Sequence, residues 1–195
     1  MDEGATELPQ GQAARRQRVV VAAFELGRQG GYEAVQMRDV ASEANVALGT
    51  IYRYFSSKDH LMAAALVEWA RDLERKVSAR PPRGDTIAER MVDILGRATR
   101  TMERDPQLSA AVVTALSSAD PKVAACQEEV GTVMGRIQQR AFPADFDPEV
   151  RDGIIRALGH VWFSSLVGWV NGWVGIRQAG DELASAAHLL LDQYG

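Results

Sequence analysis

The sequence has only one cysteine, Cys126, among its 195 residues. A single thiol forms no intramolecular disulfide and supplies no cysteine-based zinc cluster, so neither a disulfide-rich secreted domain nor a zinc ribbon is expected. The first residues include Asp2, Glu3 and Glu7 and no apolar segment of the kind that a secretory signal needs. A cytoplasmic protein is therefore the default expectation.

The sequence also lacks an excess of basic residues. Lys and Arg number 22 against 26 Asp and Glu, which gives a net charge of −4. This balance excludes a protein that binds polyanions over its whole surface, but it allows a local nucleic-acid-binding face. Common catalytic signatures, H-E-x-x-H, the Walker A loop and G-x-S-x-G, are absent, and His60, His160 and His188 stand apart. We expect neither an enzyme nor a bound cofactor or metal.

One uncharged stretch, residues 157–176, raises the question of a membrane span. About 20 uncharged residues are enough to cross a bilayer. Four glycines and the polar residues His160, Ser164, Ser165 and Asn171 interrupt this stretch, however. A helix buried on most sides within a soluble assembly is the favoured interpretation.

Short Pro- and Gly-containing segments divide the chain into pieces of helical length. Three read Asp-Pro, at 105–106, 120–121 and 147–148, and a Gln-Ala-Gly segment at 178–180 is interpreted as a further break. Asp can accept from free N–H groups at a helix start, where Pro loses only an N–H without a partner. No alternating run between hairpin turns appears, so the expected fold class is all-α. The expected helices span residues 15–29, 37–44, 48–54, 58–79, 86–104, 106–119, 121–140, 148–176 and 181–193, after a mobile arm over residues 1–14.

Residues 35–55 have the pattern of a helix-turn-helix. A short amphipathic helix ends at Asn45, a residue that tolerates left-handed φ, and Val46 can fill the gap between two helices. The second helix places Ile51 and Phe55 on its inner side. Such a helix is small enough to enter the DNA major groove, which is about 12 Å wide.

The outer side of this second helix suits DNA. Gly49 allows the backbone to approach a base edge, and the methyl group of Thr50 can meet that of thymine. The groups that can donate to phosphates are Gln36, Tyr52, Arg53, Tyr54 and Lys58. Two short helices around an Asn turn also occur in proteins that bind no DNA, in which the two tyrosines would be packing residues.

Several spaced motifs together resemble the N-terminal domain of the TetR family of bacterial transcriptional repressors. They are Gly-Tyr-Glu-Ala-Val at 31–35, Met-Arg-Asp-Val-Ala at 37–41, Leu-Gly-Thr-Ile-Tyr-Arg-Tyr-Phe at 48–55, and Ser57-Lys58. The match covers about residues 15–62. Within the family, these motifs and residues 161–166 resemble the repressors of cholesterol catabolism in actinobacteria.

The resemblance implies a nine-helix homodimer with a DNA-binding head over residues 15–60 and a ligand-binding and dimerisation body over 61–195. The DNA-contacting residues that it implies are Gln36, Arg38, Leu48, Gly49, Thr50, Tyr52, Arg53, Tyr54 and Lys58. Gln36 replaces the usual Thr or Ser, so its phosphate contact is expected to differ. Gly27 stands where a bulky apolar residue is common, which predicts looser packing of the first helix.

The body is rich in large apolar residues that form either a plain helical core or the wall of a ligand cavity. Those expected at a cavity are Leu66, Trp69, Met91, Leu95, Met102, Val112, Leu116, Met134, Trp162, Phe163 and Leu166. An apolar cavity favours a hydrophobic inducer, and the resemblance implies steroid-derived CoA thioesters. Five arginines would either bind phosphates at the mouth or form a solvated face: Arg97, Arg100, Arg104, Arg136 and Arg140.

The uncharged stretch has apolar side chains in more directions than one small domain can bury. We therefore expect a two-fold interface that combines it with the last helix, against the alternative of a wholly internal helix. The expected interface residues are Ser165, Gly168, Trp169, Gly172, Trp173, Leu183, Ala187, Leu190 and Leu191. Two hypotheses remain: a ligand-responsive regulator that binds operator DNA, and a helical carrier without a DNA function.

Overall fold

The structure, a computed structural model, describes residues 10–195. Over these residues it consists of nine α-helices and a final 3-10 turn, with no strand, which confirms the all-α prediction. The helices are α1 Gln10–Ala34, α2 Met37–Glu43, α3 Leu48–Tyr54, α4 Lys58–Ala79, α5 Ile87–Arg104, α6 Pro106–Leu116, α7 Pro121–Gln139, α8 Pro148–Val170 and α9 Ile176–Leu191. Helix α1 is kinked at Gly30 and Gly31, and Gly31 has a φ of 67°.

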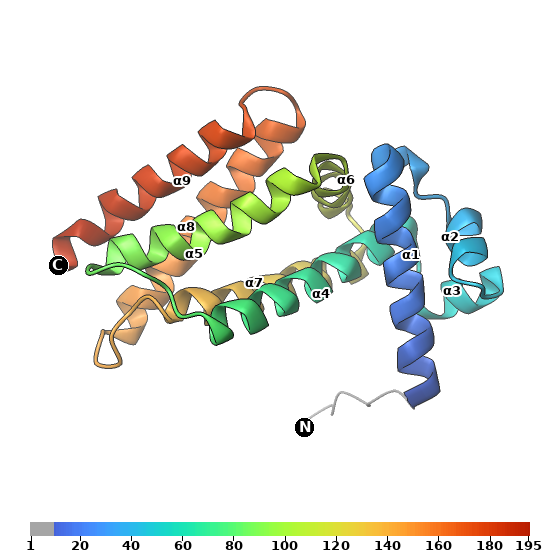
Figure 1. Cartoon of the computed structure of the whole chain (residues 1–195), viewed down its shortest axis with the longest axis horizontal. Coiled ribbons are helices and arrows are strands. Elements are labelled where there is room, and N and C mark those ends of the chain that lie inside the picture. The colour runs from blue at the N-terminus through green and yellow to red at the C-terminus, as the bar shows by residue number, and fades with distance from the viewer. Residues whose placement is uncertain (1–9) are drawn as a thin grey trace.

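The first three helices form a head at one end of the molecule, and the C-terminus lies at the other end (Figure 1). Helix α4 runs from the head into the body, where it packs along α7. Helix α6 packs against α1, and α9 packs against both α5 and α8. The main packing contacts between the head and the body are therefore made by α4 and α6.

The helix starts follow the capping residues of the sequence. The Asp120 carboxylate accepts from a backbone N–H of the first turn of α7, and Asp147 accepts from two at the start of α8. Thr86 forms a capping box at the start of α5. Asp105 also precedes a Pro but makes no such cap, because its carboxylate pairs with Arg28 of the head at 3.3 Å.

Three predicted boundaries are wrong. Helix α1 begins at Gln10, so the last residues of the expected arm are helical, while residues 1–9 lie outside the described part of the chain. Helix α8 ends at Val170 instead of residue 176, in a turn where Gly172 has a φ of 73°. The expected break at 178–180 lies inside α9, because Gly180 packs against α5, with Thr99 Cγ2 3.5 Å from the position of a Cβ. None of the helices between residues 10 and 195 is long and apolar enough to cross a membrane.

The core of the head continues into the body. One cluster of buried side chains joins Val19, Phe55 and Leu61 to Leu108 of α6 and Val123 of α7. A second cluster fills the body between α4, α5, α7, α8 and α9. The first half of α4 thus belongs to the core of the head, although the expected domain boundary falls at residue 60.

Candidate DNA interface and ligand pocket

Helices α2 and α3 have the helix-turn-helix geometry that the sequence predicts. Asn45 adopts the left-handed conformation, with a φ of 51°, and reverses the chain between the two helices. Val40, Ile51 and Phe55 are fully buried. Their burial fixes which side of α3 faces solvent.

The expected DNA-contacting residues lie at the surface of the head. The exposed ones are Gln36, Arg38, Gly49, Tyr52 and Arg53, and the half-buried ones are Leu48, Thr50, Tyr54 and Lys58. Tyr52 is 53% exposed, so its ring and hydroxyl are accessible to a binding partner. No atom outside the local backbone lies within 4 Å of a Cβ placed on Gly49, so α3 can approach another surface closely there.

Two of these residues have structural partners of their own. The Lys58 ammonium donates to the Tyr32 carbonyl at 3.0 Å and lies 3.7 Å from the centre of its ring. Tyr32 in turn donates to the Asp59 carboxylate, and burial together with this hydrogen bond raises the pKa of Tyr32 to about 12. Lys58 therefore holds the kinked end of α1 on the start of α4. The second residue with a structural partner is Gln36, whose side-chain amide donates to the Glu33 carbonyl at 2.9 Å.

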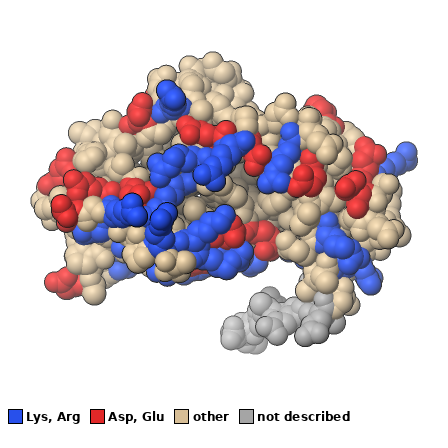
Figure 2. All heavy atoms as spheres, viewed as in Figure 1, with Lys and Arg blue, Asp and Glu red and all other residues tan. Residues whose placement is uncertain are grey.

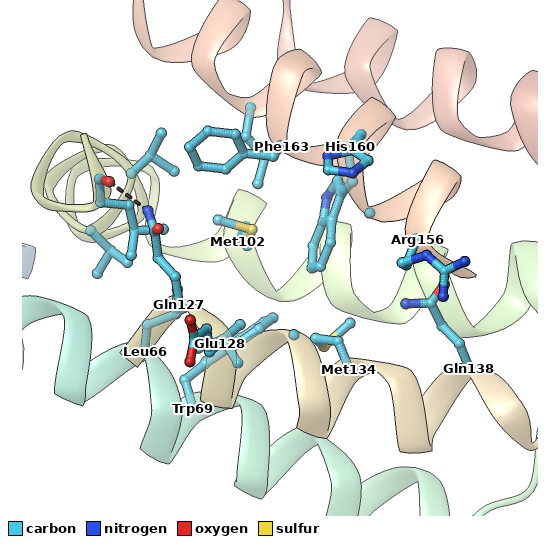
Figure 3. A pocket seen from close by; sticks show the side chains of 18 of the residues that line it. Leu66, Trp69, Met102, Gln127, Glu128, Met134, Gln138, Arg156, His160 and Phe163 are labelled. Carbon is cyan, nitrogen blue, oxygen red and sulfur yellow. Dashed lines mark hydrogen bonds between the residues drawn. The ribbon is translucent and has the colours of Figure 1, made fainter. Parts of the chain in front are cut away.

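The body contains a cavity of about 620 Å³ between α4, α5, α6, α7 and α8 (Figure 3). Its wall consists of Leu66, Trp69, Met102, Val112, Val113, Leu116, Gln127, Glu128, Val130, Gly131, Met134, Gln138, Ile155, Arg156, Gly159, His160, Trp162, Phe163 and Leu166. The indole rings of Trp69 and Trp162 face each other from α4 and α8, with their centres 6.5 Å apart. The volume and the largely apolar wall are typical of sites for small hydrophobic ligands.

Nine of the eleven residues expected at a cavity line it. Met91 and Leu95 do not, because both belong to the packed core of the body, where they are 0% and 3% exposed. The eleven expected residues are all apolar, whereas the wall also contains polar residues. Exposed Glu128 and Gly131 of α7, and exposed Arg156 and His160 of α8, show that the cavity opens between these two helices.

None of the five arginines that the sequence assigns either to a pocket mouth or to a solvated face lines this cavity. Arg97 pairs with Asp93, and Arg136 forms a two-pronged pair with Glu74 at 2.8 and 3.0 Å. On the face shown in Figure 2, basic side chains gather over the middle of the molecule, and acidic side chains lie around and among them. The solvated-face interpretation therefore fits Arg136, whose side chain is half exposed. The Arg97 side chain is largely buried, and its guanidinium also donates to the carbonyls of Arg80 and Pro81. The arginine of the pocket wall is Arg156.

Five of the nine expected interface residues are buried within the chain itself. They are Ser165, Gly168, Leu183, Ala187 and Leu191. The three α9 residues among them belong to the core of the body, because the apolar stripe of α9 faces α5 and α8. These side chains offer no surface to a second subunit. Trp169 and Leu190 are half-buried, whereas Gly172 and Trp173 are exposed, Trp173 by 75%.

A hydrogen-bonded junction joins the head to the pocket-bearing helix α7. The hydroxyls of Ser56 and Ser57 both donate to the Asp120 carboxylate at 3.1 Å. The Nδ1 atom of His60 accepts from the backbone N–H of Ser56 at 3.1 Å. These groups connect the start of α4 to the start of α7, two helices that also line the cavity.

Comparison with known proteins agrees with this arrangement. Residues 19–65 match the model described as "Bacterial regulatory proteins, tetR family", and residues 84–190 match "Tetracyclin repressor-like, C-terminal domain". The chain belongs to the TetR family. The family resemblance of the head is thereby confirmed.

Relatives of this TetR-family chain include the transcriptional repressor KstR of Rhodococcus jostii, which is 41% identical over 92% of this chain and 84% of that protein. This similarity confirms the expected subgroup. A solved TetR regulator from Rhodococcus sp. RHA1 is 31% identical, with a TM-score of 0.84 over 95% of this chain and 100% of its own. Thermus thermophilus FadR, solved in complex with lauroyl-CoA, is 24% identical and shares the fold, with a TM-score of 0.66 over 90% of this chain and 92% of its own.

Proposed function

We propose that this chain is a dimeric repressor that an apolar small molecule releases from its operator DNA. The observation that carries the proposal is the continuous core between the helix-turn-helix and the cavity-bearing body. Phe55 behind α3 and Val123 of α7 belong to one buried cluster. A change in the body therefore bears directly on the position of the reading helix.

The inducer class that we propose is a steroid-like or acyl-CoA-like metabolite. The cavity wall is mostly apolar, and it includes Met102 and Met134, whose flexible side chains can adjust to a bulky guest. The similarity to KstR, together with the resemblance to repressors of cholesterol catabolism, supports a steroid-like inducer. FadR, which shares the fold, was solved in complex with lauroyl-CoA, and this supports an acyl-CoA-like inducer.

The mechanism that we propose is a population shift. The two reading helices of a dimer must lie about one turn of DNA apart, or a multiple of it, to enter successive major grooves. Leu66 and Trp69 of α4 line the cavity, and the same helix begins at the head, so a guest that displaces α4 changes this separation. The inducer must favour the DNA-incompetent state by about 1–3 kcal/mol to act as an effective switch.

The exposed apolar residues of α8 and α9 support a two-fold dimer through these helices. Leu189 of α9 is 84% exposed and Phe163 of α8 is 40% exposed, while Trp173 projects from the turn between the helices. Exposed apolar side chains of this size are typical of surfaces that a partner covers. The proposed interface uses these residues in place of the buried stripe that includes Leu183.

The test is binding of the full chain to DNA from upstream of its own gene, measured by fluorescence anisotropy over a range of salt concentrations. We expect tight, sequence-dependent binding whose affinity falls steeply with salt. Tyr52→Phe should weaken it, whereas Tyr194→Phe, at the opposite end of the chain, should not. A carrier without a DNA function would bind this DNA no better than a scrambled sequence, and that result would reject the proposal.

A further inference from the structure

Arg156 is the arginine of the cavity wall, and it has no acidic partner. It is exposed on α8, where the cavity opens between α7 and α8. Arg151, earlier on the same helix, pairs with Asp152 at 2.9 Å. Within residues 10–195, by contrast, no carboxylate oxygen lies within 4.0 Å of the guanidinium nitrogens of Arg156. An unpaired cation at the mouth of an apolar cavity is free to bind an anion.

Gln138 of α7 lies at the same cavity and is incompletely hydrogen-bonded. Its side chain is 3% exposed, and its Oε1 atom has no hydrogen-bond partner. Among the described residues one other buried side-chain atom is unpaired in this way, Nε1 of Trp162, and Trp162 also belongs to the cavity wall. Because buried polar groups are nearly always paired, these two atoms mark a polar part of the otherwise apolar wall that can take further hydrogen bonds.

We propose that Arg156 and Gln138 form an anchor for one anionic group on the otherwise apolar inducer. This inference rests on the proposed function and adds the place of the charged end of the ligand. In Figure 3 the two side chains point toward each other from α8 and α7. A guanidinium can donate two parallel hydrogen bonds to a carboxylate or phosphate, and the Gln138 amide can donate to the same anion. A further guanidinium N–H is then available for Gln138 Oε1.

The charge of the remaining wall sets the direction of the ligand. Glu128 is the carboxylate of the wall, and Figure 3 shows it beside Trp69, away from Arg156 and Gln138. An anion is repelled at the Glu128 end and attracted at the Arg156 end. The apolar body of the ligand then extends from the anchor toward Met102 and Trp69.

The shared chemistry of the anchored group is that of a carboxylate or a phosphate ester. A matched set of probes separates the two sources: dodecanoic acid, 1-dodecanol and lauroyl-CoA, titrated into the full chain by isothermal calorimetry. Wild-type protein should bind at least one anionic probe about 10-fold more tightly than the alcohol. Arg156→Gln should remove this preference and leave the affinity for 1-dodecanol within about twofold. The control Arg177→Gln, an exposed arginine of α9 that does not line the cavity, should bind all three probes like wild type.

Gln138→Met supplies a readout that does not depend on the probe. Methionine keeps the length of the side chain and removes the unpaired oxygen, so the Tm of the empty protein should rise while the preference for the anionic probe falls. A loss confined to dodecanoic acid assigns the anchor to a carboxylate, and a loss confined to lauroyl-CoA assigns it to a phosphate.

Equal binding of acid, alcohol and thioester by the wild type would overturn the anchor, and so would binding of none of them. A uniform loss of affinity in Arg156→Gln would also overturn it. DNA binding by the same preparations distinguishes this outcome from failure of the proposed function. Operator binding that apolar probes release without preference for charge keeps the regulator and rejects the anchor. Absence of operator binding would reject the proposed regulator. The calorimetric titrations would still test whether Arg156 and Gln138 bind an anionic group.

Discussion

The hydroxyl of Ser57, which caps α4, donates to the carboxylate of Asp120, which caps α7, at 3.1 Å. Each residue satisfies the first turn of its own helix and at the same time binds the other. The start of the first body helix and the start of a pocket helix are therefore held together by side chains already fixed by capping. This contact is the polar counterpart of the apolar core that the head shares with the body.

Replacing Asp120 by Ser should loosen this junction without uncapping α7. Serine is as good an N-cap as Asp, but its shorter side chain brings no carboxylate to Ser56 and Ser57. We expect nearly unchanged Tm and several-fold faster hydrogen exchange in the first turn of α4. Asp147→Ser, at the cap of α8, is the matched control and should leave that exchange unchanged. Equal exchange in both variants would show that the junction does not hold the head.

The stability of the protein should fall as the solution becomes mildly acidic. Burial is the largest cause that lowers the pKa of His60 below its ordinary value of 6.5, with the Asp120 carboxylate partly opposing it. The unfolded state therefore takes up a proton first as the pH falls below about 6.5, and the free energy of unfolding decreases from there down to the lowered pKa. Urea denaturation between about pH 5 and 8 measures this slope. His60→Asn, which keeps an acceptor for Ser56, should flatten it, and an undiminished slope would contradict the assignment.

Gly49→Ala should separate folding from DNA binding. The new methyl group meets no atom within 4 Å on the free protein, and alanine favours a helix by up to about 1 kcal/mol. Stability should therefore be unchanged or slightly higher. Operator affinity should fall about 10-fold, because the methyl group keeps α3 from approaching the bases. Gly11→Ala, also in open space but on α1, should retain full affinity. Full affinity in Gly49→Ala would place the DNA contact elsewhere on the head.

Gly27→Leu should weaken the contact between α1 and α6. The Cδ1 atom of Leu108 lies 2.9 Å from the position of a Cβ on residue 27. The first helix is thus closely packed at Gly27, contrary to the looser packing that the sequence predicts. We expect a loss of about 1–3 kcal/mol in the free energy of unfolding, measured in urea. Gly11→Leu, on the same helix with nothing within 4 Å, is the control for helix propensity. Equal stability of the two variants would refute close packing there.

Helix order was predictable because its signals are local. Asp120 and Asp147 are each followed by Pro, and this pair of residues predicts a helix start without any knowledge of the fold. The helix break predicted at Gly180 was wrong, because packing against α5, which is distant in sequence, keeps this glycine inside α9.

The candidate site was predictable only in its apolar part. Met91 and Met102 share one stripe of α5, yet the first packs in the core and the second lines the cavity. Periodicity shows that a face is buried but not whether its neighbour is protein or empty space. Arg156 has the sequence signature of an ordinary surface arginine, and its missing acidic partner is visible only in three dimensions. The apolar stripe of α9 likewise did not indicate whether it packs against helices of the same chain, as it does, or against a second subunit.

The continuous packing from Phe55 through Leu61 to Leu108 has a consequence for engineering chimeric sensors. A graft that exchanges operator specificity by cutting at residue 60 would separate side chains that fold as one unit. Recombination after Leu66, together with transfer of the α6 residues that pack on the head, would keep the DNA-binding helices with the part of the core that supports them.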